Sequence, residues 1–138
     1  MLSFAAPATT PAEATAYITA GGEAGWPTDE AAQQQAIIRG QRAVARIYNG
    51  RWITEWANDD APDAVKYAIA EAALVEARKP GVLNAPPPDK VLTGAKGITW
   101  QVTAAKPGSP ESRMAANIAG LLAGLVAARS ASVPLVRV

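Results

Sequence analysis

Apolar positions recur at three- and four-residue spacing in four stretches of the chain, a pattern that predicts four helices. The clearest stretch covers residues 59–78, with aspartates at its start, Pro62 suited to its first turn and a Lys-Pro-Gly stop after its end. Its apolar face consists of small or branched residues: Val65, Ala68, Ile69, Ala72 and Val75. Small residues let neighbouring helices approach closely, so we expect this to be the central helix of a compact bundle.

The first helix is predicted from a capping pattern. Thr10 suits the N-cap, Pro11 suits the first helical position, and Glu13 is placed to complete a capping box. Gly21-Gly22 should end this helix. Residues 1–9 are expected to form an extended arm that has little reason to fold alone and needs a partner.

The second helix is predicted between Thr28, as its N-cap, and Asn49-Gly50. Gly40 weakens its middle by up to about 1 kcal/mol relative to alanine, so we expect a close contact there. Its buried side is expected to hold Ala36, Ile37, Ala43, Val44, Ile47 and Tyr48. Residues 51–58 follow, and we expect an irregular connection that its two tryptophans hold in the core.

The last helix is predicted over residues 109–130, with Ser109 as its cap. Its Gly120-x-x-x-Gly124 spacing resembles a small-residue packing motif, which indicates a close helix contact within the chain or between subunits. Its apolar stripe is Met114, Ile118, Leu121, Leu122 and Leu125.

Residues 81–108 differ in character, because three consecutive prolines exclude a helix there. Residues 91–95 and 98–103 alternate around Lys96-Gly97, which predicts a hairpin. The predicted fold class is therefore mainly α: a small helical bundle of about four helices with one β-hairpin and extended N- and C-terminal segments. The single domain, 1–138, divides into an arm (1–9), a helical core (10–80), a proline-rich loop and hairpin (81–108), a final helix (109–130) and a tail (131–138).

The composition removes several kinds of chemistry. The 138 residues carry a formal net charge of +1 and include no histidine and no cysteine. Ser-His-Asp triads, thiol catalysis, disulfides and Cys or His metal sites are therefore excluded within this chain. We expect no enzyme, no cofactor and no metal site. The longest uncharged stretch, 114–128, is shorter than the roughly 18–20 residues that span a bilayer, so we expect a soluble protein without membrane contact.

Carboxylates remain as candidates for chemistry. Asp59, Asp60 and Asp63 lie close together, and Glu71 and Glu76 follow on the same predicted helix. Such groups could share acid–base work or bind a hard cation through oxygen. We prefer the simpler interpretation, in which they favour the positive end of the helix and form a solvated face.

Arginines form the second candidate set. Arg39, Arg42 and Arg46 fall on roughly one side of the second helix, and Arg51 follows. Such a strip could bind phosphates, and nearby tryptophans could stack on single-stranded bases. The near-neutral charge favours a solvated face instead, and arginine is also frequent at protein–protein contacts.

The C-terminal tail is short, apolar and β-prone, which is typical of an interaction site. Its candidate partner-binding residues are Val133, Leu135, Val136, Arg137 and Val138.

The order of these elements resembles that of one protein family. The matching stretches are, in chain order, T-P-A-E-A-T-A-Y-I, D-E-A-A-Q-Q-Q-A-I-I-R-G-Q-R-A-V, R-W-I-T-E-W, A-P-D-A-V-K-Y-A-I-A-E-A-A-L, V-L-T-G-A-K-G-I-T-W-Q-V and V-P-L-V-R-V. The chain resembles the small head-to-tail adaptor (head-completion or neck connector) proteins of long-tailed bacteriophages and gene-transfer agents. Many of these carry a DnaT-like single-stranded-DNA-binding label. This chain departs from the commoner pattern in its P-P-P insert and its alanine richness.

The resemblance implies structural work. Such adaptors look like helical bundles that form a ring, commonly of twelve copies, beneath the portal, where they extend the DNA channel. The implied partners are further copies of this chain, the portal protein, a downstream head–tail stopper or tail protein, and DNA passing through the lumen without sequence specificity. The implied location is the virion neck, and the host cytoplasm during assembly.

In such a ring, Arg39, Arg42 and Arg46 would face a neighbour, the portal or the DNA, and the tail would reach the portal or a neighbouring subunit. The alternative function is a single-stranded-DNA-binding accessory protein. A small enzyme, metal-assisted through carboxylates, is the third and least favoured hypothesis.

Overall fold

The computed structural model describes residues 1–83 and 110–127. Its elements are α1 (Pro11–Ala20), α2 (Glu30–Tyr48), the short 3-10 helix η1 (Asn58–Asp60), α3 (Asp63–Arg78) and α6 (Pro110–Leu122). The described ranges contain no strand, and an isolated antiparallel bridge joins Trp52 to Val126. The prediction of a mainly helical fold with four helices is confirmed. The predicted hairpin and the C-terminal tail lie outside the described residues.

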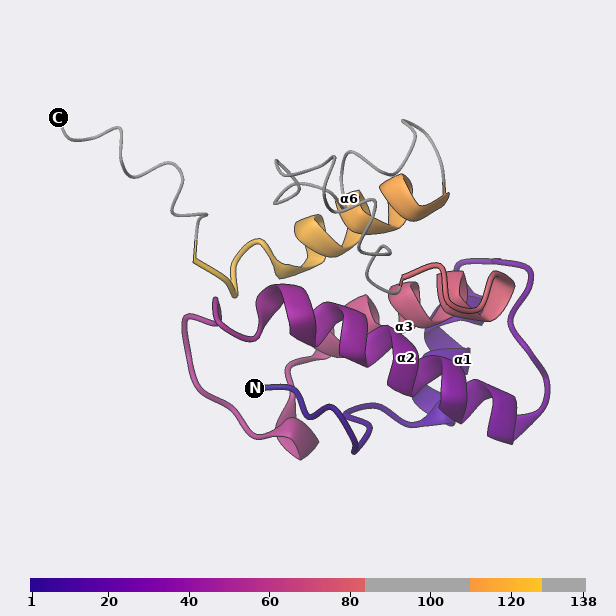
Figure 1. Cartoon of the computed structure of the whole chain (residues 1–138), viewed down its shortest axis with the longest axis horizontal. Coiled ribbons are helices and arrows are strands. Elements are labelled where there is room, and N and C mark those ends of the chain that lie inside the picture. The colour runs from indigo at the N-terminus through magenta and orange to yellow at the C-terminus, as the bar shows by residue number, and fades with distance from the viewer. Residues whose placement is uncertain (84–109, 128–138) are drawn as a thin grey trace, which may run out of the picture.

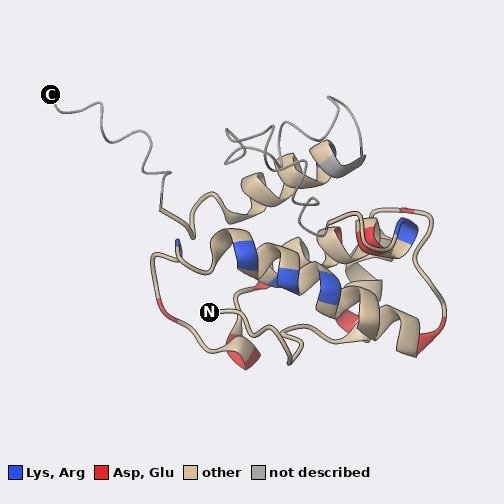
Figure 2. Ribbon diagram, in the orientation of Figure 1, with Lys and Arg blue, Asp and Glu red and all other residues tan. Residues whose placement is uncertain are grey.

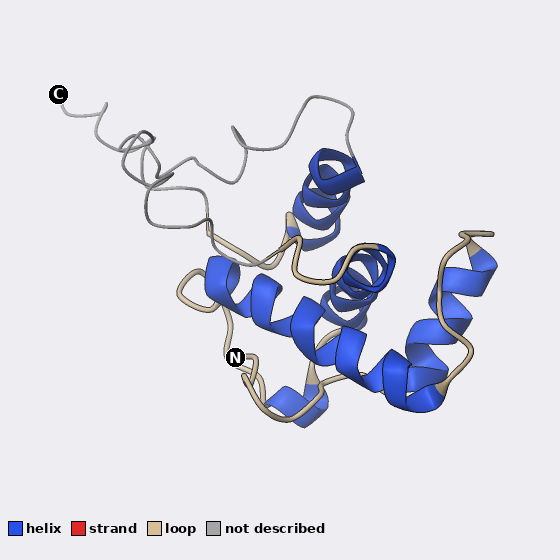
Figure 3. Ribbon diagram, turned by 45° about the vertical axis from the view of Figure 1, so that its right-hand side comes forward, coloured by secondary structure: helices blue, strands red, loops and turns tan. Residues whose placement is uncertain are grey.

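Helix α3 is the centre of the bundle, because α1, α2 and α6 all pack against it (Figures 1 and 3). Its predicted apolar face is buried, with Val65 and Ile69 fully inaccessible. The helix begins at Asp63 and not at residue 59. Residues 58–60 form η1, and Pro62 has an extended backbone (φ −59°, ψ 152°) at the N-cap.

The crossing of α2 over α3 depends on a glycine. A Cβ atom at Gly40 would lie 2.5 Å from the backbone nitrogen of Ala73 and 2.9 Å from the carbonyl carbon of Ala72. Real Cβ atoms do not approach backbone atoms this closely, so the two helices touch here through main chain. The predicted close contact at Gly40 is confirmed.

The capping box of α1 is present as predicted. Thr10 Oγ1 accepts from the Glu13 N–H at 3.1 Å, and Glu13 Oε1 accepts from the Thr10 N–H at 3.0 Å. The predicted cap of α2 is wrong by one residue, because Asp29 and not Thr28 is the N-cap. Its Oδ2 accepts from the Ala32 N–H at 3.0 Å, and a carboxylate also favours the positive end of a helix.

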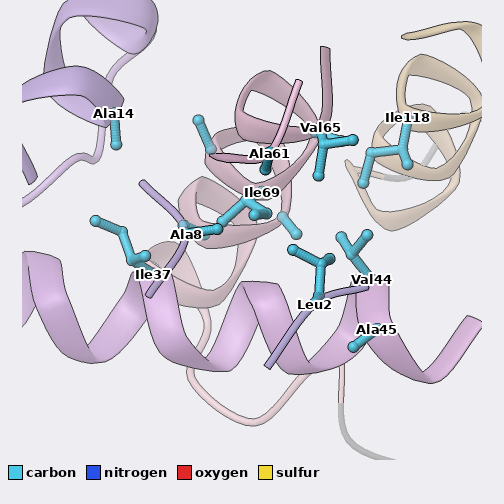
Figure 4. Close-up of a cluster of buried hydrophobic side chains, with 14 of the residues drawn as sticks. Leu2, Ala8, Ala14, Ile37, Val44, Ala45, Ala61, Val65, Ile69 and Ile118 are labelled. Carbon is cyan, nitrogen blue, oxygen red and sulfur yellow. The ribbon is translucent and has the colours of Figure 1, made fainter. Parts of the chain in front are cut away.

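The N-terminal segment, residues 1–9, packs against the chain's own helices, so the expectation that it needs a partner is wrong. Leu2 is only 2 % exposed and lies in the core (Figure 4). The buried amide of Gln41 accepts from the Ala8 N–H at 2.7 Å and donates to the carbonyls of Ser3 and Ala6 at 2.7 and 2.8 Å. One side chain of α2 therefore satisfies three backbone groups of this segment.

Helix α6 ends at Leu122, earlier than the predicted residue 130. The chain turns at residues 123–125 and pairs with the connection that follows α2: the Ile53 N–H donates to the Leu125 carbonyl at 3.0 Å, and the Ala127 N–H donates to the Arg51 carbonyl at 2.8 Å. Residues 51–58 are irregular outside η1, as predicted, and their two indoles pack against the core.

Residues from all four α-helices and from the N-terminal segment meet in one core (Figure 4). Ile37 and Val44 come from α2, Val65 and Ile69 from α3, and Ile118 from α6. Alanines fill much of the remaining space, which is why the helices approach closely.

Candidate functional site

The three predicted arginines share the exposed face of α2. Arg39, Arg42 and Arg46 are all exposed, and Figure 2 shows three basic bands along the side of α2 that faces the viewer. Positions i, i+3 and i+7 lie on one side of a helix. The structure therefore brings these residues together, as predicted.

The charges of these arginines are not balanced by nearby acids. Arg42 Nε donates to the carbonyl of Phe4 at 2.9 Å, and an Arg46 Nη donates to the carbonyl of Leu83 at 2.9 Å. Within residues 1–83 and 110–127 none of the three forms an ion pair. The contacts of Arg42 and Arg46 are with neutral backbone carbonyls, so no acid of the described residues pairs with their positive charge.

Phe4 is a surface residue that the sequence analysis missed. Its side chain is 50 % exposed although its neighbours along the chain are held by Gln41 and Asn58. Its carbonyl accepts from Arg42 Nε, so the backbone of Phe4 lies beside the arginines. We refer to Phe4, Arg39, Arg42 and Arg46 as the arginine face. No local sequence signal marked Phe4, because the fold of residues 1–9 depends on Gln41, more than thirty residues away.

Arg51 does not belong to this face. Its guanidinium lies 5.0 Å from the centre of the Tyr48 ring, and one Nη donates to the Ala127 carbonyl at 3.1 Å. The tryptophans are also engaged: Trp52 and Trp56 meet edge to face at 4.9 Å, and Trp52 Nε1 donates to Asn49. The nearby stacking platforms that the single-stranded-DNA interpretation required are therefore packed against one another.

The predicted solvated face of carboxylates is wrong for Glu71 and Glu76. Glu76 is 1 % exposed, and its two oxygens accept from the N–H groups of Gly81 and Leu83, each at 3.0 Å. Glu71 accepts from the Tyr17 hydroxyl at 2.8 Å. Both acids serve structural contacts that depend on tertiary packing, which helix periodicity does not reveal.

Asp59, Asp60 and Asp63 are exposed, as expected. Among the described residues no cluster of three acidic side chains is arranged to hold a metal ion. No helix within the described ranges is both long and apolar enough to cross a membrane.

A groove of about 410 Å³ lies between α1 and the start of α3, and sequence reasoning missed it. Two tyrosines that are fifty residues apart, Tyr17 and Tyr67, stack there with ring centres 4.7 Å apart and planes 14° apart. Lys66 Nζ pairs with Glu13 at 3.4 Å. We call this the tyrosine groove; it is lined by Thr9, Glu13, Ala16, Tyr17, Ala20, Asp63, Lys66 and Tyr67.

Two titratable groups in the groove have shifted pKa values. Burial and the hydrogen bond to Glu71 raise the pKa of Tyr17 to about 12, so its hydroxyl stays protonated and donates. The backbone N–H of Thr10 is the main cause that lowers the pKa of Glu13, with a further contribution from Lys66. The groove therefore presents the ionised carboxylate of Glu13 and the neutral ring of Tyr17.

The packing motif in α6 makes no internal contact in the described part of the chain. A Cβ atom at Gly120 or at Gly124 would meet nothing within 4 Å. The Gly-x-x-x-Gly spacing indicated a close helix contact either within the chain or between subunits. For these residues the contact within the chain is wrong, and the contact between subunits stays a prediction. The predicted tail residues 133–138 lie outside the described residues.

Comparisons with protein-family models, with curated proteins and with solved structures found no match to this chain.

Proposed function

We propose that this chain is a structural virion protein that forms the adaptor ring between a portal and the downstream neck or tail proteins. Its partners are other copies of itself, in a ring of twelve, the portal protein and a head–tail stopper or tail protein. DNA passes through the lumen of the ring without sequence-specific contact. The protein works in the virion neck after assembly in the host cytoplasm.

The observation that carries this proposal is the arginine face. Three exposed arginines form no ion pair among the described residues, and one of them, Arg42, binds the backbone of the half-exposed Phe4. Arginine and aromatic side chains are enriched at protein–protein contacts, where they carry much of the binding energy. An uncompensated basic face also suits a surface next to a portal or to DNA.

The experiment that tests the proposal is a mass measurement of the purified chain, alone and mixed with portal protein, followed by electron microscopy of the complex. The expected result is a closed ring on the portal. A chain that stays monomeric in the presence of portal protein would overturn the proposal.

The C-terminal tail supplies a second test. Deleting residues 131–138 should leave the helical core folded, as measured by circular dichroism, and abolish binding to the portal. Unchanged binding would show that Val133, Leu135, Val136, Arg137 and Val138 are not the docking residues.

A single-stranded-DNA-binding accessory protein remains the second candidate function, because Phe4 offers a half-exposed aromatic ring on the segment whose backbone Arg42 binds. Phosphate binding through the arginine face would weaken steeply with added salt. The test is a fluorescence titration with a labelled single-stranded oligonucleotide at several salt concentrations. Absence of binding at low salt would remove this candidate.

A further inference from the structure

The arginine face and the tyrosine groove lie on different parts of the molecule. No residue of α2 lines the groove. In Figure 1, α1 lies behind α2, whereas the basic bands of α2 face the viewer in Figure 2. An arginine face therefore meets a tyrosine groove only when the two belong to different copies of the chain.

The groove has the chemistry that a guanidinium group requires. Arginine stacks on aromatic faces and pairs with carboxylates; Tyr17 and Tyr67 cover one face of each other, and the groove offers the exposed remainder of Tyr67 together with the carboxylate of Asp63. Tyr67 is 40 % exposed, so its ring is accessible. The volume of about 410 Å³ accommodates one or two long side chains.

The charge of the groove is complementary to that of the arginine face. Lys66 is occupied by Glu13, whereas Asp63 is exposed and forms no ion pair among the described residues. The arginine face carries positive charge, and none of its arginines forms an ion pair within the described residues.

From this match we propose that the arginine face of one copy docks into the tyrosine groove of the next, with Arg39 directed to Asp63 and the tyrosine rings. The contact joins two different surfaces, so it is heterologous and closes into a ring when the rotation between copies permits. The inference rests on the proposed ring function and names the surfaces by which its subunits meet. Arg39 is the residue chosen for testing because it contacts no described side chain through a hydrogen bond or ion pair.

The test uses two charge reversals in the full chain, Arg39→Glu and Asp63→Lys, with Glu55→Lys as the matched control on another exposed acid. Self-association is measured by sedimentation velocity at the highest soluble concentration, alone and on portal protein. Circular dichroism checks that each variant is folded. Each reversal should weaken self-association at least about tenfold, since it places like charges opposite one another, and the control should behave as the wild type.

The equimolar mixture of the two reversals should recover association, because contacts between the two variants can again join opposite charges. The proposal is overturned if either variant associates as the wild type does, if the mixture stays dissociated, or if the wild type fails to associate both alone and on the portal. Failure of the inference alone would appear as variants that still form full rings on the portal. Failure of the adaptor function would appear as a wild type that self-associates through these faces without binding the portal.

Discussion

Helices α2 and α6 both pack against α3, but they do so in different ways. Helix α2 meets α3 at Gly40, where a single added carbon atom would collide with backbone, whereas α6 rests on it through the large side chains of Ile118 and Leu122. Gly120 in α6 and Gly124 in the turn after it would, as alanines, meet no atom of the described chain within 4 Å. Glycine within a helix therefore has two meanings here: in α2 it permits contact, and in α6 it leaves a surface uncovered by the described chain.

The largest expected effect comes from Gly40→Ala. The new methyl group would overlap the main chain of Ala73, which cannot rotate away as a side chain can, so we expect a loss of about 3 kcal/mol in the free energy of unfolding. Chemical denaturation followed by circular dichroism measures this loss. A variant as stable as the wild type would show that α2 and α3 can move apart at no cost.

The second effect concerns Gln41, the neighbour of Gly40 on α2. Gln41→Leu keeps the volume but leaves the Ala8 N–H and the Ser3 carbonyl without their partner, whereas the Ala6 carbonyl keeps its hydrogen bond from Asn58 Nδ2. We expect a loss of about 2 kcal/mol in unfolding free energy, together with faster amide hydrogen exchange in residues 1–9. Exposed Gln34→Leu, on the same helix, is the control.

The corresponding glycine substitution in α6 should stabilise the fold, whereas that in α2 should destabilise it. Gly120→Ala places a methyl group in open space within a helix, where alanine is favoured over glycine by up to about 1 kcal/mol. Thermal unfolding should show a small stabilisation. Destabilisation would mean that Gly120 is covered after all, and loss of self-association without loss of stability would indicate that another subunit covers it.

The smallest expected effect concerns Tyr17, through which α1 contacts α3, and its contribution to stability changes only at alkaline pH. The unfolded chain keeps the ordinary tyrosine pKa of 10.0, whereas the folded chain raises that of Tyr17 to about 12. The folded state thus binds the proton more tightly, so this contribution is complete below pH 10 and is lost as pH rises toward 12. Ultraviolet titration should show a tyrosine that ionises near pH 12, and Tyr17→Phe should remove that step.

Local signals allowed much of the fold to be predicted. The Thr10–Glu13 capping box and the end of α2 at Asn49 depend on residues within a few positions of one another. The contact at Gly40 was also predictable, because a glycine in the middle of an otherwise good helix needs a reason to be there. The common face of the three arginines followed from helix geometry alone.

The features that the sequence did not reveal all depend on residues far apart in the chain. The burial of Leu2 requires Gln41 and Asn49, and the tyrosine groove requires that α1 and α3 bring Tyr17 and Tyr67 together. The end of α6 at Leu122 is set by pairing with residues near Trp52. In each case a tertiary contact determined the structure against the local sequence pattern. Periodicity therefore could not reveal the tyrosine groove, which is one of the two surfaces of the proposed interface.

The buried carboxylate of Glu76 fixes the residues that follow α3. Its two oxygens accept hydrogen bonds from the N–H groups of Gly81 and Leu83, while Arg46 of α2 donates to the Leu83 carbonyl. Leu83 is thus fixed to two helices at once, to α3 through Glu76 and to α2 through Arg46.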